Sequence, residues 1–486
     1  MNARVGTALF FAAALVGMIA LALGAELNHD EHQFVASAAL LAREGLLPYR
    51  DFPYFHTPNL VGIYALLFQL TDHLLLAARL FSMVCAWLSG LVLFGFAWRR
   101  SSSIAFALGV AALFLTNPVV VYTFPKAWNN FPPVLLLLLA FVSQCRGART
   151  AHVGWFFASG LFVAFAAGTR ISFAPLALPF LVMAWFTPGK WRTVAAALAG
   201  MFLASIPVFF FLAITPGEFL FDNLVYNGRV NAAYRLASGD ERSALAAKAF
   251  FVAKTLVNPG NLALFAAGLF ALWQVARRYR SDYAVALLLA ILPFVLLGVF
   301  APTPSYTQYY SVLAAVLALA VAIGLKPRPI WPLAAAVGLS LIASLVQHFT
   351  MLTRFASGKW TPLQLHAKGR AVPAEAGPGR ILTLAPIVAL EGGSEIYGAF
   401  ATGSFAWRTA PYLSEEDRRR HGFVAPPDLP ALLAAQPPAG ILLGYDKERE
   451  EALLNYAKTH GYRRVKLPDK INLWLPPAAA PGNSSP

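Results

Sequence analysis

The stretch VGTALFFAAALVGMIALALGA (5–25) contains no charged residue. An α-helix of about 20 apolar residues crosses the ~30 Å hydrocarbon core of a bilayer. Similar runs recur through most of the chain, which has 486 residues and is 58% hydrophobic but only 13% charged. Ordinary soluble domains are about 25% charged. Because backbone polar groups in lipid must be satisfied within the segment itself, the sequence predicts a polytopic α-helical membrane protein.

The basic charge points to membrane topology rather than to nucleic acid. The formal net charge is +15. Much of it lies in short clusters between apolar runs: Arg99-Arg100, Arg146 with Arg149, Lys190 with Arg192, Arg277-Arg278 with Arg280, and Lys326 with Arg328. This is the pattern of cytoplasmic loops, so nucleic-acid binding is the weaker interpretation. The two cysteines, Cys85 and Cys145, lie in or beside apolar runs and imply no disulfide framework.

With the amino terminus and the basic clusters placed in the cytoplasm, the chain makes eleven crossings. They are expected near 5–25, 77–98, 104–122, 131–145, 153–169, 172–187, 194–213, 260–276, 283–300, 308–324 and 330–349. We expect the first run to be an uncleaved anchor, since the apolar part of a signal peptide is usually about 7–15 residues long.

Two large outer loops follow from this topology, at 26–76 and 214–258. The segment NLVGIYALLFQLT (59–71) is apolar but short for a span, and we interpret it as re-entrant or interfacial. A true crossing there would place every later basic cluster outside, against the positive-inside rule.

The character of the sequence changes after the transmembrane domain (1–349). Residues 350–379 are polar and rich in Gly and Pro, which indicates a linker. The remainder predicts a small α/β domain over 380–475 on the outer face, with strands at RILTLAP (380–386) and AGILLGY (439–445) and a disordered tail at 476–486. A charged amphipathic helix is expected over 447–462, with Gly461 ending it.

Directly after the first run comes LNHDEHQF (27–34), which pairs two carboxylates. On the simpler interpretation Asp30 is the N-cap of a helix over 31–44, with Gln33 completing a capping box. A carboxylate at the mouth of a lipid-bordered cavity is also partly desolvated, which raises its pKa towards that of a useful general base. The aromatic stretch GLLPYRDFPYFHTPN (45–59) is expected to return Asp51 and His56 to the same face.

These motifs resemble the GT-C integral-membrane glycosyltransferases, and in particular the protein O-mannosyltransferases and lipid A aminoarabinose transferases. The resemblance covers about 26–100 by motif and the rest by architecture. It implies polyprenyl-phosphate-linked sugar donors and a catalytic acid in the first outer loop. Asp30 matches that acidic position, and Glu31 matches its acidic neighbour.

The resemblance extends to further positions and fails at one. His56 and Pro58 match the His-Pro pair of the mannosyltransferase branch, although Thr57 replaces a second proline. Arg79 matches an arginine that recurs at the start of the next helix. Many relatives have an aspartate in the second outer turn, where this chain has Asn129-Asn130. No cofactor is therefore certain, and a divalent cation (Mg²⁺ or Mn²⁺) is left open.

A departing polyprenyl phosphate needs positive charge or hydrogen-bond donors at the outer interface. Candidate donor-phosphate ligands at outer ends or in outer loops are Arg79, Lys126, Arg170, Arg229, Tyr309 and Tyr310. Arg235 is a further cation in the second outer loop. Candidate substrate contacts are His29, Asp51, His56, Trp128 and Asn129. Alternatively, the cations extend to lipid headgroups and bind no donor. The aromatic residues would then belong to the belt of aromatic side chains at the membrane interface.

The sequence thus predicts an inverting membrane glycosyltransferase, with Asp30 as the base. Its expected partners are a polyprenyl-phosphate sugar donor, membrane lipid and an envelope acceptor, which is lipid A, another glycan or protein. The predicted location is the inner membrane, with the active site facing the periplasm. The alternatives are a transporter or flippase for a lipid-linked glycan and a non-catalytic scaffold for envelope assembly. Transporters usually place ionisable residues in mid-membrane, whereas most of the spans here have apolar centres.

Overall fold

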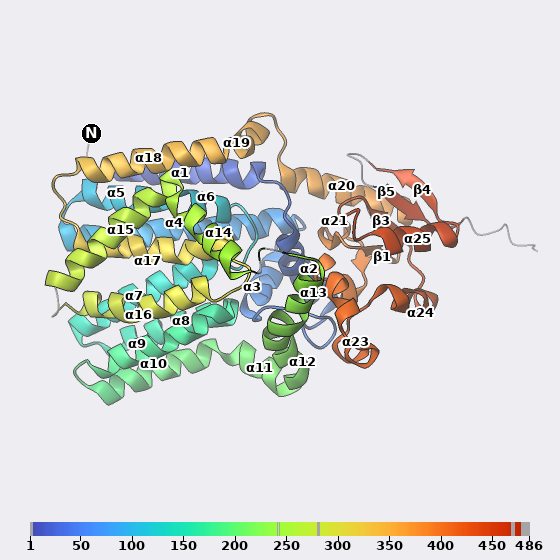
Figure 1. Ribbon diagram of the computed structural model, residues 1–486, viewed down its shortest axis with the longest axis horizontal. Helices are drawn as coiled ribbons and strands as arrows, with labels where there is room; N and C mark the ends of the chain where they lie inside the picture. Colours follow the sequence, from blue (N-terminus) through green and yellow to red (C-terminus); the bar gives the residue numbers. More distant parts are fainter. Residues whose placement is uncertain (1–2, 241, 243, 279–281, 468–471, 478–486) are drawn as a thin grey trace, which may run out of the picture.

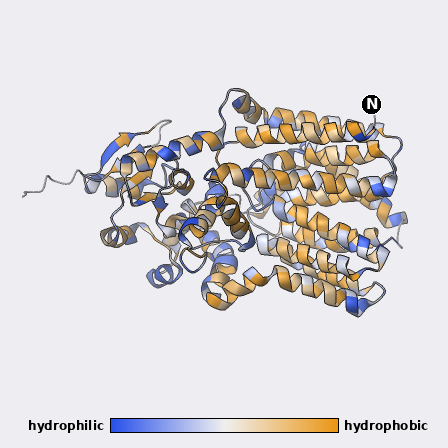
Figure 2. Cartoon of the chain, turned by 180° about the vertical axis from the view of Figure 1, so that it is seen from behind, coloured by the Kyte–Doolittle hydropathy of each residue, from blue (hydrophilic) through white to orange (hydrophobic). Residues whose placement is uncertain are grey.

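The computed structural model describes residues 3–240, 242, 244–278, 282–467 and 472–477. It consists of a bundle of long helices and a smaller domain built around a sheet at one end of that bundle (Figure 1). Figure 2 shows that the bundle helices are mostly hydrophobic, whereas polar residues gather in the smaller domain and at the ends of the helices. We call the end of the bundle that contacts the smaller domain the domain end, and the opposite end the arginine end.

Within the described residues, six helical segments are long and apolar enough to cross a membrane. They are α1 (Ala3–Gly24), α4 (Leu74–Ser101), α7 (Phe131–Thr150), α15 (Pro259–Arg278), α16 (Tyr283–Phe300), and η4 (Thr307–Tyr310) continued by α17 (Ser311–Gly324). Two bent pairs also qualify: α10 (Lys190–Ala204) with α11 (Ile206–Ile214), and α18 (Trp331–Gln347) with α19 (Phe349–Ala356). Each of these eight coincides with a predicted crossing.

The other three predicted crossings are shorter apolar helices. They are α5 (Ile104–Leu115) followed by α6 (Pro118–Thr123), α8 (Val153–Thr169), and η1 (Ile171–Leu176) continued by α9 (Ala177–Trp185). The segment 59–71 forms α3 (Asn59–Phe68). Ten helical residues extend only about 15 Å, half of the ~30 Å hydrocarbon core. The predicted polytopic helical fold is confirmed.

Glycines allow the closest helix contacts in the bundle. A Cβ added to Gly160 of α8 would lie 2.0 Å from the carbonyl oxygen of Ala197, and one added to Gly200 of α10 would lie 2.1 Å from that of Phe157. Only a residue without a side chain fits at either point, which is how small residues bring transmembrane helices together.

The smaller domain is α/β, as predicted. Its sheet has the order β2-β1-β3-β5-β4, with β1 (Arg380–Thr383) parallel to β2 (Glu395–Ile396) and to β3 (Gly440–Leu443), and β5 (Asn472–Leu475) antiparallel to both β3 and β4 (Arg463–Lys466). Its helices are α20 (Thr361–Ala376), α21 (Pro386–Glu391), η5 (Gly398–Phe400), α22 (Ser404–Thr409), η6 (Ala410–Tyr412), α23 (Glu415–His421), η7 (Pro426–Asp428), α24 (Leu429–Ala435) and α25 (Glu451–Thr459).

Three boundaries differ from the sequence expectations. Residues 350–379 are largely α19 and α20 rather than a plain linker, because apolar side chains such as Leu365 and Val372 are buried against the domain. The predicted loop 214–258 is mostly helical, as α12 (Pro216–Leu220), π-helical η2 (Phe221–Val230), α13 (Asn231–Ala237) and α14 (Leu245–Val257). Most of the predicted tail, 478–486, lies outside the described residues.

The domain is held against the bundle through α2 (His29–Glu44) and the start of α4. Arg43 of α2 donates to the Leu390 carbonyl at 2.5 Å. Glu391 accepts a hydrogen bond from the Leu75 backbone N–H at 2.7 Å, so the domain caps the first turn of α4. This docking places α22 and the segment before α25 beside the first residues of α2.

Candidate active site

A cavity of about 440 Å³ lies at the domain end, between the bundle, the segment from η2 to α13, and the smaller domain. It brings together seven of the residues predicted for the site: His29, Asp30, His56, Trp128, Asn129, Arg170 and Tyr309. Five separate parts of the chain supply these side chains. The cavity is therefore assembled by the fold and does not belong to one loop.

The start of α2 is capped differently from the prediction. Asn28, not Asp30, is the N-cap: its side chain accepts from the Asp30 backbone N–H at 3.0 Å, and Glu31 Oε2 accepts from the Asn28 N–H at 2.9 Å. The capping box is thus Asn28 with Glu31, and Gln33 has no part in it. The Asp30 carboxylate has no hydrogen-bond partner within the described part of the chain, and it lines the cavity.

Glu31 is buried and paired, so its surroundings differ from those of Asp30. Its two oxygens accept from Nε and Nη2 of Arg79, each at 2.7 Å, and both side chains are 0% exposed. Oε1 also accepts from the Ala127 N–H at 2.8 Å. The prediction of Glu31 as a catalytic group is therefore corrected: it holds α2, α4 and the turn before α7 together.

The prediction that Arg79 binds the donor phosphate is corrected for the same reason. Besides Glu31, its guanidinium donates to the carbonyls of Ala22, Ala25 and Glu26 at 2.7–3.1 Å. No donor is left for a phosphate, and the side chain does not line the cavity. Arg79 fixes the exit of α1 against α4.

The charges around Asp30 set its protonation. Burial raises the pKa of Asp30 above the ordinary value of 3.8, the positive charges of Arg408 and Lys126 oppose that rise, and Glu31 adds to it. A carboxylate with a raised pKa that faces a cavity and has no hydrogen-bond partner among the described residues is a better proton acceptor than an ordinary surface carboxylate.

Two predicted cations lie close to this carboxylate. Arg170 follows α8 directly; it donates to Asn129 Oδ1 at 3.2 Å, and its guanidinium lies 4.7 Å from the centre of the Tyr309 ring. Lys126 does not line the cavity itself: its Nζ lies 3.5 Å from the Tyr122 ring and 4.4 Å from the Trp128 ring. Burial lowers the pKa of Lys126 to about 8.

His56 lies on the wall of the cavity as a neutral ring. Burial, assisted by the charge of Arg170, lowers its pKa to about 3. Its Nδ1 is 3.3 Å from Asn129 Nδ2, and Oδ1 of the same Asn129 side chain accepts from Arg170. His56, Asn129 and Arg170 therefore form a connected row of polar groups on one side of the cavity.

Three predicted residues lie elsewhere. Arg229 is exposed and does not line the cavity. Tyr310 is 0% exposed, packs in the bundle core and hydrogen-bonds with Ser305 at 3.1 Å. Asp51 pairs with Arg50 at 2.7 Å and accepts from the Leu47 N–H, so it stabilises its own turn.

Four further arginines line the cavity: Arg235, which the sequence offered as a cation of the second outer loop, and Arg242, Arg408 and Arg449, which the sequence did not single out as ligands. Arg235 and Arg242 come from the η2–α13 region, and Arg408 and Arg449 from the smaller domain. Arg235 donates to the Tyr306 hydroxyl at 2.8 Å and pairs with Asp240 at 2.8 Å. The Nε of Arg408 is buried without a hydrogen-bond partner among the described residues. The cavity thus has cations on its domain side as well as on its bundle side.

Possible metal ligands gather away from this cavity. In the ranges that the structure describes, the one group of three such side chains is His73, His366 and Glu391, whose ligand atoms lie within 4.8 Å of one another. These residues stand where the domain docks on α4. The divalent cation that the sequence left open, Mg²⁺ or Mn²⁺, stays open.

The fold of the chain is similar to that of solved structures, although the sequences share little identity. The chain is similar to ArnT, the lipid A aminoarabinose transferase, from Cupriavidus metallidurans bound to undecaprenyl phosphate, with a TM-score of 0.65, 13% identity and 98% of both chains covered. Its similarity to apo ArnT of the same organism has a TM-score of 0.59, 14% identity and covers 97% of this chain and 98% of ArnT.

A weaker similarity joins the chain to the Archaeoglobus fulgidus oligosaccharyltransferase in complex with zinc and sulfate. Its TM-score is 0.49, with 11% identity over 80% of this chain and 62% of the other. No model of a known protein family matches the chain, and no curated protein sequence does. The predicted GT-C-like fold is confirmed at the level of three-dimensional structure.

Proposed function

We propose that this protein is a membrane glycosyltransferase that takes a sugar from a polyprenyl-phosphate donor and passes it to an envelope acceptor. The observation that carries the proposal is the Asp30 carboxylate, which has no hydrogen-bond partner in the described ranges and shares its cavity with Arg170, close to the buried Lys126. The similarity to ArnT bound to undecaprenyl phosphate supports a polyprenyl-phosphate ligand. The acceptor class is lipid A, another glycan or protein.

The chemistry is a single displacement at the anomeric carbon. An acceptor hydroxyl attacks that carbon while its proton passes to Asp30. The bond from the anomeric carbon to the phosphate oxygen breaks, and its electron pair leaves with the phosphate. One displacement inverts the anomeric configuration. General-base assistance contributes roughly 10²–10⁴-fold to such a step.

Arg170 stabilises the departing phosphate, and so does Lys126, which lies behind the Tyr122 and Trp128 rings that line the cavity. Positive groups fixed where charge develops lower the barrier without reorganising during the reaction. Tyr309 holds the Arg170 guanidinium by its ring face, while Trp128 and His56 offer flat surfaces for a sugar. We place the domain end in the periplasm, because the opposite end carries the arginine clusters.

The test separates chemistry from binding. Asp30→Asn keeps the size of the side chain but removes the base, so transfer should fall roughly 10²–10⁴-fold. Binding of undecaprenyl phosphate to the purified variant should be unchanged. Transfer is measured by mass analysis of envelope glycolipids and glycoproteins from cells with each variant, and binding is measured by titrating undecaprenyl phosphate in detergent.

Asp72→Asn is the matched control, since the Asp72 side chain is 84% exposed and pairs only with Arg43 in the structure described. It should retain full transfer. Full transfer by Asp30→Asn would contradict the role of the base. Loss of undecaprenyl phosphate binding in Asp30→Asn would show that the carboxylate organises the site and does not act in the chemical step.

A further inference from the structure

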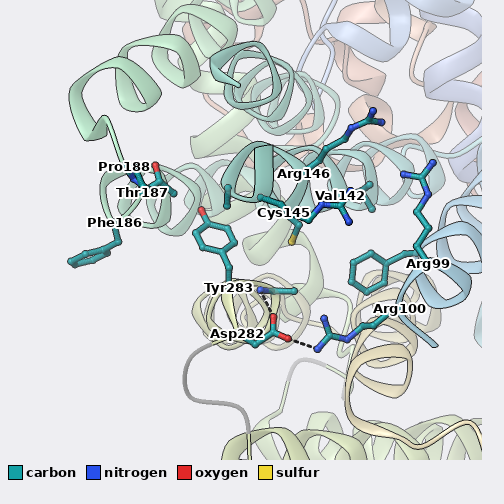
Figure 3. Close-up of a pocket in the computed structure, with 14 residues that line it drawn as sticks. Arg99, Arg100, Val142, Cys145, Arg146, Phe186, Thr187, Pro188, Asp282 and Tyr283 are labelled. Carbon is teal, nitrogen blue, oxygen red and sulfur yellow. Dashed lines mark hydrogen bonds and ion pairs between the residues drawn. The ribbon is translucent and has the colours of Figure 1, made fainter. Parts of the chain in front are cut away.

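A second cavity, of about 540 Å³, lies at the arginine end of the bundle (Figure 3). The last turn of α4 supplies Arg99 and Arg100, and the end of α7 supplies Arg146 and Arg149. Helix α7 begins next to Asn130 at the candidate active site and has 20 residues, about 30 Å. The two cavities are therefore on opposite sides of the apolar layer.

The charge of this cavity is unbalanced. Among the described residues that line it are four arginines and a single carboxylate, Asp282. Asp282 already pairs with Arg100 and caps α16, accepting from the Ala284 N–H at 2.9 Å.

The four arginines are engaged to different degrees. Arg146 stacks 4.2 Å from the centre of the Trp155 ring. Arg99 and Arg149 have no ion pair or hydrogen bond to any described residue. Two guanidinium groups are thus left with their donors free at the rim of the cavity.

Apolar side chains line the same cavity as these arginines. The cavity wall includes Phe96, Val142 and Phe186, and Phe186 is 74% exposed. Figure 3 shows the Phe186 ring turned outward, away from the arginines on the other side of the cavity. A soluble anion would use only the charged half of such a surface, whereas a molecule with an anionic head and apolar chains would use both halves.

We propose that this cavity binds the phosphate headgroup of an anionic phospholipid from the leaflet at the arginine end. Guanidinium groups donate two parallel hydrogen bonds to phosphate oxygens. Basic pockets between transmembrane helices are suited to phospholipid headgroups. Arg99 and Arg149 hold the phosphate, and the acyl chains lie along the wall near Phe186. Free phosphate shares the headgroup chemistry but gains nothing from that wall.

The experiment uses the full-length protein in detergent micelles, titrated with phosphatidylglycerol and, separately, with phosphatidylcholine. The wild type should bind phosphatidylglycerol more tightly, and native mass spectrometry should count the retained lipid. Arg99→Gln/Arg149→Gln should weaken phosphatidylglycerol binding roughly 30-fold. The matched control is Lys190→Gln/Arg192→Gln, which removes two charges from the same end but not from the cavity.

The possible outcomes are decisive. Loss in the first double variant alone supports the proposal. Equal loss in both double variants overturns it, because general surface charge would then explain the binding. Inorganic phosphate that competes as strongly as phosphatidylglycerol assigns the cavity to a soluble anion and also overturns it. If Arg99→Gln/Arg149→Gln fails to fold, Arg99→Lys/Arg149→Lys replaces it, because this variant keeps both charges. It must still bind phosphatidylglycerol more tightly than phosphatidylcholine, and equal binding of the two lipids overturns the proposal.

Discussion

Asp30 and Glu31 are adjacent in the sequence, yet they belong to two regions with different electrostatics. Glu31 lies in a closed region, where Arg79 and the Ala127 N–H satisfy both of its oxygens. Asp30 faces an open cavity and has no hydrogen-bond partner among the described residues. A step of one residue, about 100° around the helix axis, separates a carboxylate that stabilises the fold from one that lines the cavity.

The comparison shows why a buried charge alone does not identify a functional residue. A buried ion pair with all its donors and acceptors used is a structural element, however strongly a motif resembles a ligand. Burying part of a carboxylate without a hydrogen-bond partner costs free energy, and a substrate that supplies the partner offsets that cost. The signal for function is the missing partner, and it becomes visible only in three dimensions.

The largest stability effect should come from breaking the closed pair. Arg79→Met leaves Glu31 buried without a counter-ion, which should lower the free energy of unfolding by about 3–5 kcal/mol. The measurement is equilibrium unfolding in mixed micelles. Arg229→Met is the matched control, because Arg229 is exposed. The double variant Glu31→Gln/Arg79→Met should recover part of the loss, and a double variant as unstable as the single one would contradict the charge explanation.

The open region should respond through activity instead. Arg170→Gln removes the positive charge beside Tyr309, and the loss of one preorganised stabilising group typically lowers kcat roughly 10²–10³-fold. Undecaprenyl phosphate should also bind more weakly, while the free energy of unfolding changes little. Arg229→Gln again serves as the control. An Arg170→Gln protein with normal transfer would remove Arg170 from the phosphate site and leave Lys126 and Arg408 as the candidates.

The sequence predicts features that depend on local patterns and misses those that depend on contacts between residues far apart in the chain. The length of the apolar runs predicted the helical bundle, and two short continuous apolar runs predicted strands β1 and β3, because both patterns are local. Asp30, His56 and Arg170 were found by motif and by their position at span ends. Arg408 and Arg449 were missed, since only the docking of the domain on α2 brings them to the cavity.

The errors have the same origin. The sequence placed the cap at Asp30 because aspartate is a preferred N-cap, but Asn28 starts the helix two residues earlier and leaves the carboxylate free. Arg79 was assigned to phosphate because no sequence pattern shows that three carbonyls and Glu31 already use its donors.

The pH dependence of transfer should report both charges of the open region. Asp30 must be ionised to act as the base, and since its pKa is raised, activity should rise with pH on a limb above the ordinary value of 3.8. Lys126 has its pKa lowered to about 8, so its charge is lost as the pH rises through that value and activity should fall. Lys126→Arg keeps the charge and should shift the alkaline limb upward. An unchanged alkaline limb would assign it to another group.

The smallest expected effect concerns the cap that joins the two regions. The Asn28 side chain accepts from the Asp30 backbone N–H while the Asn28 backbone N–H donates to Glu31, so Asn28 fixes the backbone of Asp30 and one oxygen of Glu31. Asn28→Ala should lower the free energy of unfolding by about 1 kcal/mol, the usual cost of losing an N-cap. Asn28→Ser restores an acceptor at the same position and should be close to wild type in the same mixed-micelle unfolding.

If the alanine variant loses transfer out of proportion to its stability and the serine variant does not, the cap also sets the direction in which Asp30 faces the cavity. If alanine and serine behave alike, Asp30 is held by the packing of α2 against the domain, and the separation of the two carboxylates is a property of the docked interface.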